Sequence, residues 1–356
     1  MRVLTVIGNR PQFVKAAAVS GPLRDVADEI LVHTGQHYDD ALSRVFFDEL
    51  RLPRPEHRLE LGGGSNTAQT SLMLAALEGL LASERPDAVL VYGDTNSSLA
   101  GALAGAQARI PVAHVEAGMR SFDRRMPEEL NRVLTDHAAS LLLCSSASAA
   151  AHLHAERVQG DVVVCGDVMV DVAALVAPMA RGRADVPMAH GVEPGGYLLV
   201  TAHRAGNVDD PVRLRRLVDL LLSLDRPVVL PLHPRTAARL EAADLMGRLA
   251  AAPHIHMSSP LGYVEFTALV QQAVAVLTDS GGVQKEAYLA GVPCVTLRDT
   301  TEWTETVEAG WNVLVDLDAA AAREALARPR PAEHPPLYGD GRAGARVVEA
   351  LLRMAG

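Results

Sequence analysis

The sequence has few of the residues that mark several classes of protein. Only three of its 356 residues are cysteine, and Cys144, Cys165 and Cys294 lie far apart. This excludes a disulfide scaffold and a zinc site built on cysteines. No apolar run approaches the roughly 20 residues that span a bilayer, and the residues before Arg10 are too few for the core of a signal peptide. We therefore expect a cytoplasmic protein without a membrane partner.

Lysine is almost absent from the chain. Of 33 basic residues only Lys15 and Lys285 are lysine, a bias that GC-rich coding explains most simply, and Lys285 is expected to be an ordinary helix cation. The 43 acidic residues outnumber the basic ones and give a formal net charge of −10. Because the phosphates of a nucleic acid are neutralised by a basic face, this balance argues against a nucleic acid as the partner.

Short apolar runs alternate with stretches of helical spacing along the whole chain. Runs of this kind, rich in valine, isoleucine and leucine, are typical of strands buried on both faces. Strands that alternate with helices predict an α/β protein with doubly wound parallel sheets. The expected strands are Val3–Ile7, Glu29–His33, Ala88–Tyr92, Val112–Val115, Ser140–Cys144, Val162–Cys165, Leu198–Thr201, Val228–Leu232, His254–Met257, Ala275–Thr278 and Cys294–Leu297. The clearest helices are Thr67–Ser83, Ser97–Arg109, Pro211–Ser223, Val264–Gln272 and Gly341–Met354.

The length and a change in composition predict two domains. A chain of 356 residues is about twice the usual size of one domain. The stretch Ala180–Gly196 carries prolines and glycines between two series of expected strands. We therefore expect Rossmann-like domains at residues 1–168 and 169–340. In doubly wound sheets the ligand lies at the carboxyl ends of the strands, so the residues after each run are candidates for chemistry.

Three acidic residues lie near the expected strand ends of the first domain. Asp94 and Glu116 follow neighbouring strands, and Glu128 lies in the next helix. Each has an ordinary explanation, because Asp94 could cap a helix and Glu128 could pair with Arg132, four residues further on. Since all three fall on one edge of one sheet, their like charges are expected to raise one another's pKa. Such a cluster suits acid/base catalysis.

Basic residues and glycines indicate anion binding in both domains. Arg10 and Lys15 lie beside the start of a helix, where cations are unfavourable unless an anion lies between them and the helix. In the second domain Ser280, Gly281 and Gly282 join a strand to a helix. Such a turn exposes backbone N–H groups at the positive end of the helix, an arrangement suited to a diphosphate.

Further polar residues end neighbouring strands of the second domain. His203 and Arg204 follow one strand, His233 follows another, and Glu286 lies one turn into the helix, where it could bind two ribose hydroxyls. These residues predict that the second domain holds a nucleotide-diphosphate compound, facing the carboxylates of the first. Since no GxGxxG fingerprint and no familiar metal-ligand spacing are present, neither a nicotinamide cofactor nor a metal is expected.

The motifs, in this order, resemble the non-hydrolysing UDP-N-acetylglucosamine 2-epimerase family. The matching segments are residues 8–11, 34–37, 93–95, 114–118, 127–129, 131–132, 203–204, 278–282 and 298–302. The resemblance implies the two-domain glycosyltransferase-B fold, with the active site in a cleft and the C-terminal helix, residues 341–356, returning to the first domain. It also implies a UDP-sugar substrate, a homodimer, and no need for a metal or a nicotinamide cofactor.

The resemblance further implies inversion at C2 of the sugar, which converts UDP-GlcNAc to UDP-ManNAc. In the family's scheme a base removes the C2 proton while UDP leaves C1 by anti elimination, giving a 2-acetamidoglucal. UDP then re-adds, and a proton reaches the opposite face of C2. The acid/base candidates are Asp94, Glu116 and Glu128, with His203 assisting the departure of the diphosphate. The implied substrate-binding residues are Arg10, Lys15, Arg132, Arg204, His233, Ser280, Gly281, Gly282 and Glu286.

The sequence departs from the family pattern at several positions. Tyr38 stands where many bacterial members have arginine, and residues 62–69 also differ, which weakens the resemblance at the family's second, activating UDP-GlcNAc site. After Arg204, Ala205 and Gly206 replace a continuation that includes glutamate, and Thr304 stands where proline is common. Three features resemble a branch that includes epimerases of UDP-2,3-diacetamido-glucuronic acid: His37-Tyr38-Asp39, Met126-Pro127-Glu128-Glu129 and Trp303.

Four alternatives to plain UDP-GlcNAc epimerisation therefore stay open. One is the epimerase of that related UDP-sugar. Another is a hydrolysing 2-epimerase, which releases ManNAc and UDP after the same first half-reaction. The remaining two are a glycosyltransferase of the same fold and a non-catalytic UDP-sugar binder.

Overall fold

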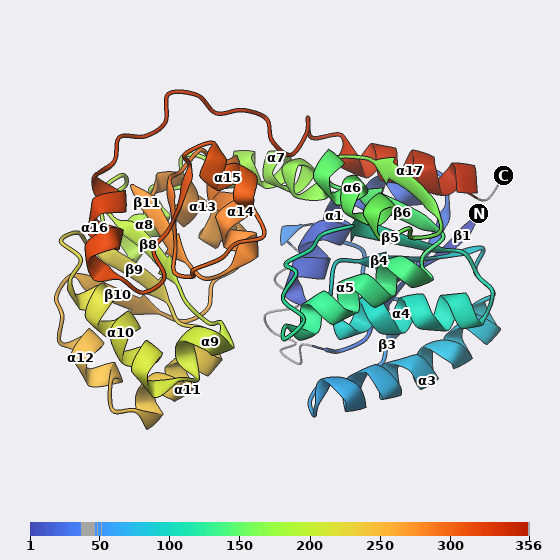
Figure 1. Cartoon of the computed structure of the whole chain (residues 1–356), viewed down its shortest axis with the longest axis horizontal. Helices are drawn as coiled ribbons and strands as arrows, with labels where there is room; N and C mark the ends of the chain where they lie inside the picture. The colour runs from blue at the N-terminus through green and yellow to red at the C-terminus, as the bar shows by residue number, and fades with distance from the viewer. Residues whose placement is uncertain (37–46, 48, 51, 355–356) are drawn as a thin grey trace. The chain divides into compact units, whose positions relative to one another are not determined.

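The computed structural model describes residues 1–36, 47, 49–50 and 52–354. The chain divides into two compact units, Met1–Ala174 with Tyr338–Gly356, and Leu175–Leu337. Each unit is built on one parallel sheet flanked by helices (Figure 1), which confirms the predicted α/β class. The boundary expected after residue 168 and the one between the units both fall in a single helix, α7 (Val168–Ala180).

The first unit contains a seven-stranded sheet in the order β3-β2-β1-β4-β5-β6-β7. Its strands are β1 (Arg2–Ile7), β2 (Asp28–His33), β3 (His57–Arg58), β4 (Ala88–Tyr92), β5 (Val112–Ala117), β6 (Leu141–Cys144) and β7 (Asp161–Val164). Its helices are α1 (Arg10–Arg24), α3 (Asn66–Glu84), α4 (Asn96–Gln107), α5 (Pro127–Ala138), α6 (Ala147–Ala155), the start of α7, and α17 (Ala343–Met354). Because β1, β4 and β5 are neighbours, their carboxyl ends lie side by side. We call this edge of the sheet the first rim.

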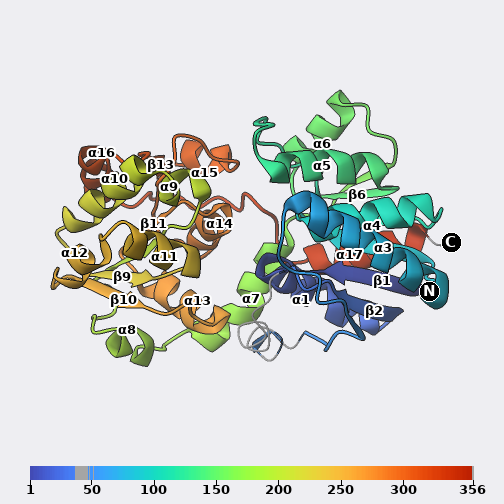
Figure 2. The ribbon, with the colours of Figure 1, turned by 90° about the horizontal axis from the view of Figure 1, so that it is seen from below.

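Helices cover both faces of the first sheet. Apolar residues of α3, α4 and α6 form one buried cluster with the strands, and Met73, Leu77 and Leu81 recur on α3 at helical spacing. Figures 1 and 2 together show α3 and α4 on one face of the sheet and α17 on the opposite face. The strands, buried on both sides, therefore read as continuous apolar runs.

The second unit contains a six-stranded parallel sheet in the order β10-β9-β8-β11-β12-β13. Its strands are β8 (Leu198–Thr201), β9 (Val228–Pro231), β10 (Ile255–Ser258), β11 (Ala275–Thr278), β12 (Cys294–Thr296) and β13 (Asn312–Leu314). Its helices are the end of α7, α8 (Asp185–Ala189), α9 (Ala205–Val208), α10 (Pro211–Leu222), α11 (Pro234–Ala242), α12 (Met246–Ala250), α13 (Tyr263–Gln272), α14 (Gly281–Leu289), α15 (Thr304–Glu308) and α16 (Ala319–Ala327). Here β9, β8 and β11 are neighbours, and we call the edge formed by their carboxyl ends the second rim.

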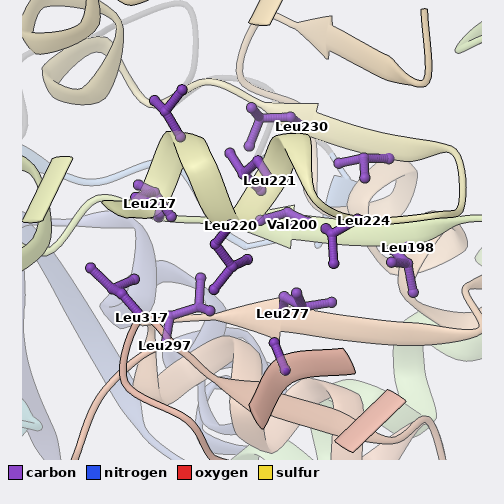
Figure 3. Close-up of a cluster of buried hydrophobic side chains, with 14 of the residues drawn as sticks. Leu198, Val200, Leu217, Leu220, Leu221, Leu224, Leu230, Leu277, Leu297 and Leu317 are labelled. Carbon is purple, nitrogen blue, oxygen red and sulfur yellow. The ribbon is translucent and has the colours of Figure 1, made fainter. Parts of the chain in front are cut away.

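Leucines of α10 form much of the core of the second unit. Leu217, Leu220 and Leu221 are at most 2% exposed and pack against strands β8, β9 and β11 (Figure 3). Fully burying a side chain of this size contributes about 1.5–3 kcal/mol. The core therefore holds α10 against the strands whose ends carry the polar candidates.

Helix α17 returns to the first unit and packs against α1. The carboxylate of Asp171 on α7 accepts hydrogen bonds from the backbone N–H groups of Ala343 and Gly344, at 3.1 and 2.9 Å. These bonds satisfy donors that the first turn of a helix leaves unpaired. A Cβ on residue 344 would lie 2.2 Å from the backbone oxygen of Ala18, so glycine allows the close approach of α17 to α1.

The sequence did not predict the short strands β3 and β13 or the helix α7. The two strands have only two and three residues, too few to show a periodic pattern, and they pair only at the edges of the sheets. Helix α7 contains Pro178, a residue that is unfavourable inside a helix. No helix within the described residues is long and apolar enough to cross a bilayer.

The three cysteines are buried and form no disulfide. Burial raises the pKa of Cys144, Cys165 and Cys294 to about 12. Since the thiolate is the nucleophile and the metal ligand, burial disfavours thiol chemistry at these positions. The described parts of the chain also hold no group of three or more potential metal ligands.

Candidate active site

The first rim carries an ion pair between Lys15 and Glu116. Lys15 extends from α1, and its Nζ contacts Glu116 Oε2 at the end of β5. Both side chains are mostly buried. Burial alone would lower the pKa of Lys15, but the charges of Glu116 and Asp94 outweigh it and raise that pKa. The anion expected beside Lys15 is thus supplied by the protein itself.

Gly93 makes room for this ion pair. Its φ of +62° favours glycine, and a Cβ there would lie 3.0 Å from Lys15 Nζ and 3.2 Å from Glu116 Oε2. The motif Gly93-Asp94 therefore combines a position without a side chain with a carboxylate that follows it directly.

Asp94 pairs with Arg132 of α5. Arg132 donates to Asp94 Oδ2 at 2.5 Å and to Glu129 Oε2 at 2.9 Å. The ordinary explanation that Asp94 caps α4 is wrong, because Thr95 occupies the cap and exchanges hydrogen bonds with Ser98. Arg132 thus pairs with a residue that precedes it by 38 positions and with Glu129.

Glu129, which the motifs did not single out as a candidate, supports this arrangement. It is 2% exposed and accepts hydrogen bonds from Ser121 N, Ser121 Oγ and Phe122 N, each at 2.9 Å. Burial alone would raise the pKa of Glu129, but these bonds and Arg132 lower it. The motif Pro127-Glu128-Glu129 contains both acids, but the sequence does not show which of them the fold buries.

The three candidate carboxylates have different neighbours in the structure from those expected. We expected like charges facing one another, whereas Glu116 faces Lys15 and Asp94 faces Arg132. Glu128 lies partly buried in the first turn of α5 and makes no hydrogen bond or ion pair with the described residues. Two carboxylates are thus held in ion pairs, while the third is available to a ligand. Arg10 lies at the start of α1 on the same rim.

The rim of the second unit is organised by Asp279. This completely buried carboxylate accepts hydrogen bonds from the backbone N–H groups of His203 and Arg204 and from Asn207 Nδ2, at 3.0–3.1 Å. Asp279 follows β11 and His203 follows β8, so the contacts connect two neighbouring strand ends. They place the side chains of His203 and Arg204 at the carboxyl edge of the sheet.

The imidazole rings of His203 and His233 stack on each other, with centroids 5.3 Å apart. His233 is the N-cap of α11, and its Nδ1 accepts from Arg235 N at 3.1 Å. In this geometry the proton of His233 lies on Nε2. The His203 ring is 38% exposed, so it is accessible to a ligand while the stack fixes its plane.

The Ser280-Gly281-Gly282 turn opens α14, as expected. Gly281 is enclosed, because a Cβ there would lie 3.3 Å from Trp303 Nε1 and 3.4 Å from Glu302 Oε2. Trp303 Nε1 donates to the Gly281 carbonyl at 2.9 Å. Glu302 pairs with Arg298 at 3.0 Å. Burial would raise the pKa of Glu302, but Arg298 lowers it.

Lys285 is not the ordinary helix cation that we expected. It is 2% exposed, and its Nζ lies 3.7 Å from the centre of the Trp303 ring, a cation–π distance. Trp303 is 18 positions away, so local sequence could not show the contact. Glu286, the ribose candidate, is partly buried and accepts a hydrogen bond from Tyr263. Burial and the charge of Glu286 raise the pKa of Tyr263 well above its usual value.

The region linked to the family's activating site is only partly described. Gln36 Oε1 accepts from Ser97 Oγ at 2.7 Å and from Ser97 N at 3.2 Å, at the start of α4. His37 and Tyr38, which carry the departure from the family pattern, lie outside the described residues.

The two rims have different chemical capacities. The first offers carboxylates with adjacent cations, which suits proton transfer next to a charged ligand. The second offers a glycine turn at a helix N-terminus, an arginine and an accessible histidine, which suits a diphosphate.

Known proteins share the sequence and the fold of the chain. A family model described as UDP-N-acetylglucosamine 2-epimerase matches residues 23–352. A protein of Methanococcus maripaludis named as a homologue of UDP-N-acetylglucosamine 2-epimerase is 43% identical, over 99% of both chains. The UDP-2,3-diacetamido-2,3-dideoxy-D-glucuronate 2-epimerase of Pseudomonas aeruginosa is 44% identical, over 99% of this chain and all of its own.

A solved structure is also similar over nearly the full length. The crystal structure of Methanocaldococcus jannaschii UDP-GlcNAc 2-epimerase in complex with UDP-GlcNAc and UDP has a TM-score of 0.93 and 39% identity. The match covers 99% of this chain and 100% of that one.

Proposed function

The chain belongs to the UDP-N-acetylglucosamine 2-epimerase family, and we propose that it inverts C2 of a UDP-linked 2-acetamido sugar without hydrolysing it. This membership confirms the family that the motifs indicated, and it identifies the protein as an isomerase. The single observation that supports the proposal most is the first rim, where Glu116 and Asp94 each lie against a cation, and Glu128 shares the edge.

In the proposed reaction the second unit binds UDP. The N–H groups of the Ser280-Gly281-Gly282 turn and the guanidinium of Arg204 bind the diphosphate, and Glu286 binds the ribose hydroxyls. His203 donates a hydrogen bond to the diphosphate as it departs, and its stacking on His233 restricts the ring to one plane. Negative charge that develops on the leaving oxygen is thereby met by donors that are already oriented.

The first unit handles the protons in the proposed reaction. A carboxylate takes the proton from C2, the C–H electron pair becomes the C1–C2 double bond, and the C1–O bond breaks with its pair going to UDP. In the return step UDP attacks C1, and a carboxylic acid gives a proton to the other face of C2. Two faces require two proton-handling groups, for which we propose Asp94, Glu116 and Glu128 as candidates. Lys15, Arg10 and Arg132 offset the charge beside them.

The test is exchange at C2 in deuterium oxide. We expect NMR of UDP-GlcNAc incubated with the protein to show deuterium at C2 and a mixture of the gluco and manno UDP-sugars. Accumulation of free UDP and ManNAc would instead support a hydrolysing enzyme. Absence of both exchange and manno product would count against UDP-GlcNAc as the substrate.

Removing the proton carriers tests catalysis against simple binding. Glu116→Gln or Asp94→Asn keeps the shape but loses the base, so kcat should fall by roughly 10²–10⁴. UDP affinity, measured by calorimetry, should stay nearly unchanged, because we assign UDP to the second unit. The matched control is Asp25→Asn, an exposed acid after α1, which should keep full activity. Equal activity of all three variants would indicate that these carboxylates do not transfer protons.

A second candidate substrate is UDP-2,3-diacetamido-glucuronic acid. The 44% identity to the Pseudomonas aeruginosa enzyme named for this sugar favours it. The two substrates differ at C3 and C6, whereas the chemistry at C1 and C2 is the same. Comparing kcat/KM for both UDP-sugars decides between them, since the true substrate should have the higher value.

A further inference from the structure

The backbone of Glu116 adopts an unusual conformation. Its φ is +71°, which residues other than glycine seldom adopt, and the pairing of β5 with β6 shifts between Val115 and Ala117. Glu116 is thus the extra residue of a β-bulge. Bulges re-aim side chains at strand ends, and a conformation of this kind persists only where surrounding contacts hold it.

Asp136 of α5 contacts the chain on both sides of Glu116. Its Oδ1 lies 2.7 Å from His114 Nδ1, two residues before Glu116. Its Oδ2 accepts from Gly118 N at 3.1 Å, two residues after Glu116. The side chains of Asp136 and His114 are completely buried. One carboxylate therefore fixes both ends of the segment that contains the bulge.

The network extends to the neighbouring strand and to a second carboxylate. His114 Nε2 lies 2.8 Å from the Gly93 carbonyl, just before Asp94. A carbonyl oxygen only accepts, so His114 Nε2 donates to it, and the ring links Asp136 to the residue that follows β4. Arg120 donates to Asp136 Oδ2 at 2.7 Å and pairs with Glu156. Burial would raise the pKa of Asp136, but His114 and Arg120 lower it.

We propose that Asp136 is a positioning residue, which holds the bulge so that the Glu116 carboxylate points to the proton it transfers. The proposal rests on the proposed function for the identity of that proton, but its geometric part concerns the backbone of Glu116 alone. Asp136 itself touches no reacting atom. It acts through His114 and the Gly118 amide, which also keep Gly93 and Asp94 next to Glu116.

Another buried carboxylate of the same unit provides a matched control. Glu29 is 4% exposed and accepts from Thr5 Oγ1 and Arg24 Nε, each at 2.8 Å. It lies at the amino-terminal end of β2, away from the carboxyl ends that carry the site. Glu29→Ala should therefore destabilise the first unit as Asp136→Ala does, without moving Glu116.

The experiment compares Asp136→Ala, Asp136→Asn and Glu29→Ala in the full chain. Asp136→Ala should lower kcat about 100-fold, the size expected for a misplaced catalytic group, with KM for the UDP-sugar unchanged. Asp136→Asn should recover most of the lost kcat. Its amide oxygen can accept from Gly118 N and Arg120, and its amide N–H can donate to His114 Nδ1. Glu29→Ala should lower the melting temperature as much as Asp136→Ala does, but it should keep the wild-type kcat.

A crystal structure of Asp136→Ala gives a readout that does not depend on activity. We expect Glu116 to leave the positive-φ region and the Lys15–Glu116 pair to break. If the bulge persists, or if Glu29→Ala loses kcat to the same extent, the positioning role is wrong.

If Asp136→Ala does not fold, the crystal structure and kcat of Asp136→Asn decide. An intact bulge with near-normal kcat supports the proposal, and an intact bulge with kcat lost overturns it. Wild-type protein inactive on both UDP-sugars would refute the proposed function, while the crystal structures would still decide the positioning role.

Discussion

At the scale of single residues, the two lysines are the least expected feature. In a chain with 33 basic residues, Lys15 and Lys285 are its only lysines. Lys285 is buried and Lys15 is partly buried, each next to candidate site residues. A lysine that contacts a carboxylate or an aromatic ring can be buried at lower cost than an isolated ammonium. Both lysines are therefore better explained by their contacts than by coding bias.

The first prediction concerns the contribution of Lys285 to UDP binding. Lys285→Met retains the apolar contact with Trp303 but removes the charge that lies one turn inside α14. We expect UDP to bind roughly tenfold more weakly, since a desolvated cation–π contact and its charge are worth about 1–2 kcal/mol. Titration calorimetry with UDP measures this change. Lys285→Arg, which keeps the charge and stacks on aromatic rings, is the control, and unchanged affinity of Lys285→Met would limit Lys285 to a role in stability.

At the scale of elements, the ends of helices and strands decide the geometry. Asp171 satisfies the first N–H groups of α17, Thr95 caps α4, and Asp279 connects the ends of β8 and β11. The contacts of Asp171 and Asp279 join elements that are distant in the sequence, whereas the cap of Thr95 lies within α4. The position of a rim residue therefore depends on such caps as well as on the apolar core.

The second prediction tests the docking of α17 on α1. In Gly344→Ala the new Cβ meets the backbone oxygen of Ala18, so the helices must move apart at a cost of about 1–3 kcal/mol. We expect a lower melting temperature and faster proteolysis near residue 338. Gly79→Ala is the control, because Gly79 lies in α3 with nothing within 4 Å of a new Cβ, and alanine should stabilise that helix by about 0.5–1 kcal/mol. Equal melting temperatures of the two variants would contradict the close packing of α17.

At the scale of the whole molecule, both units bury ionised carboxylates. Glu129 and Asp136 lie in the first unit and Glu302 in the second, and hydrogen bonds and arginines lower the pKa of all three against the effect of burial. A carboxylate whose pKa is lower in the folded than in the unfolded state stabilises the fold above its unfolded pKa. That contribution is lost as the pH falls through the folded pKa.

The third prediction is therefore an acid-sensitive fold. The melting temperature should change little between pH 7 and about pH 5, and should fall steeply below about pH 4, where unfolded Asp and Glu take up protons. Calorimetry at constant ionic strength measures this profile. Asp136→Asn should show a shallower acid limb, because it lacks one of the titrating groups. A melting temperature that stays constant down to pH 3 would show that these carboxylates do not control stability.

The sequence by itself determined the class of fold, the order of its strands along the chain, and the family. Apolar runs such as Ala88–Tyr92 and Leu198–Thr201 are local signals, and both strands have the predicted bounds. Polar residues directly after such runs also mark the candidate site, because parallel strands end at one edge.

Only the tertiary structure decided which of those residues face one another. Lys15 meets Glu116 across 101 positions, Arg132 meets Asp94 across 38, and Lys285 lies against Trp303. The bulge at Glu116 likewise lies between two contacts of Asp136, a residue 20 positions later. The physical reason is that strand and helix patterns repeat over a few residues, whereas ion pairs and hydrogen bonds form between whatever side chains the crossovers bring together.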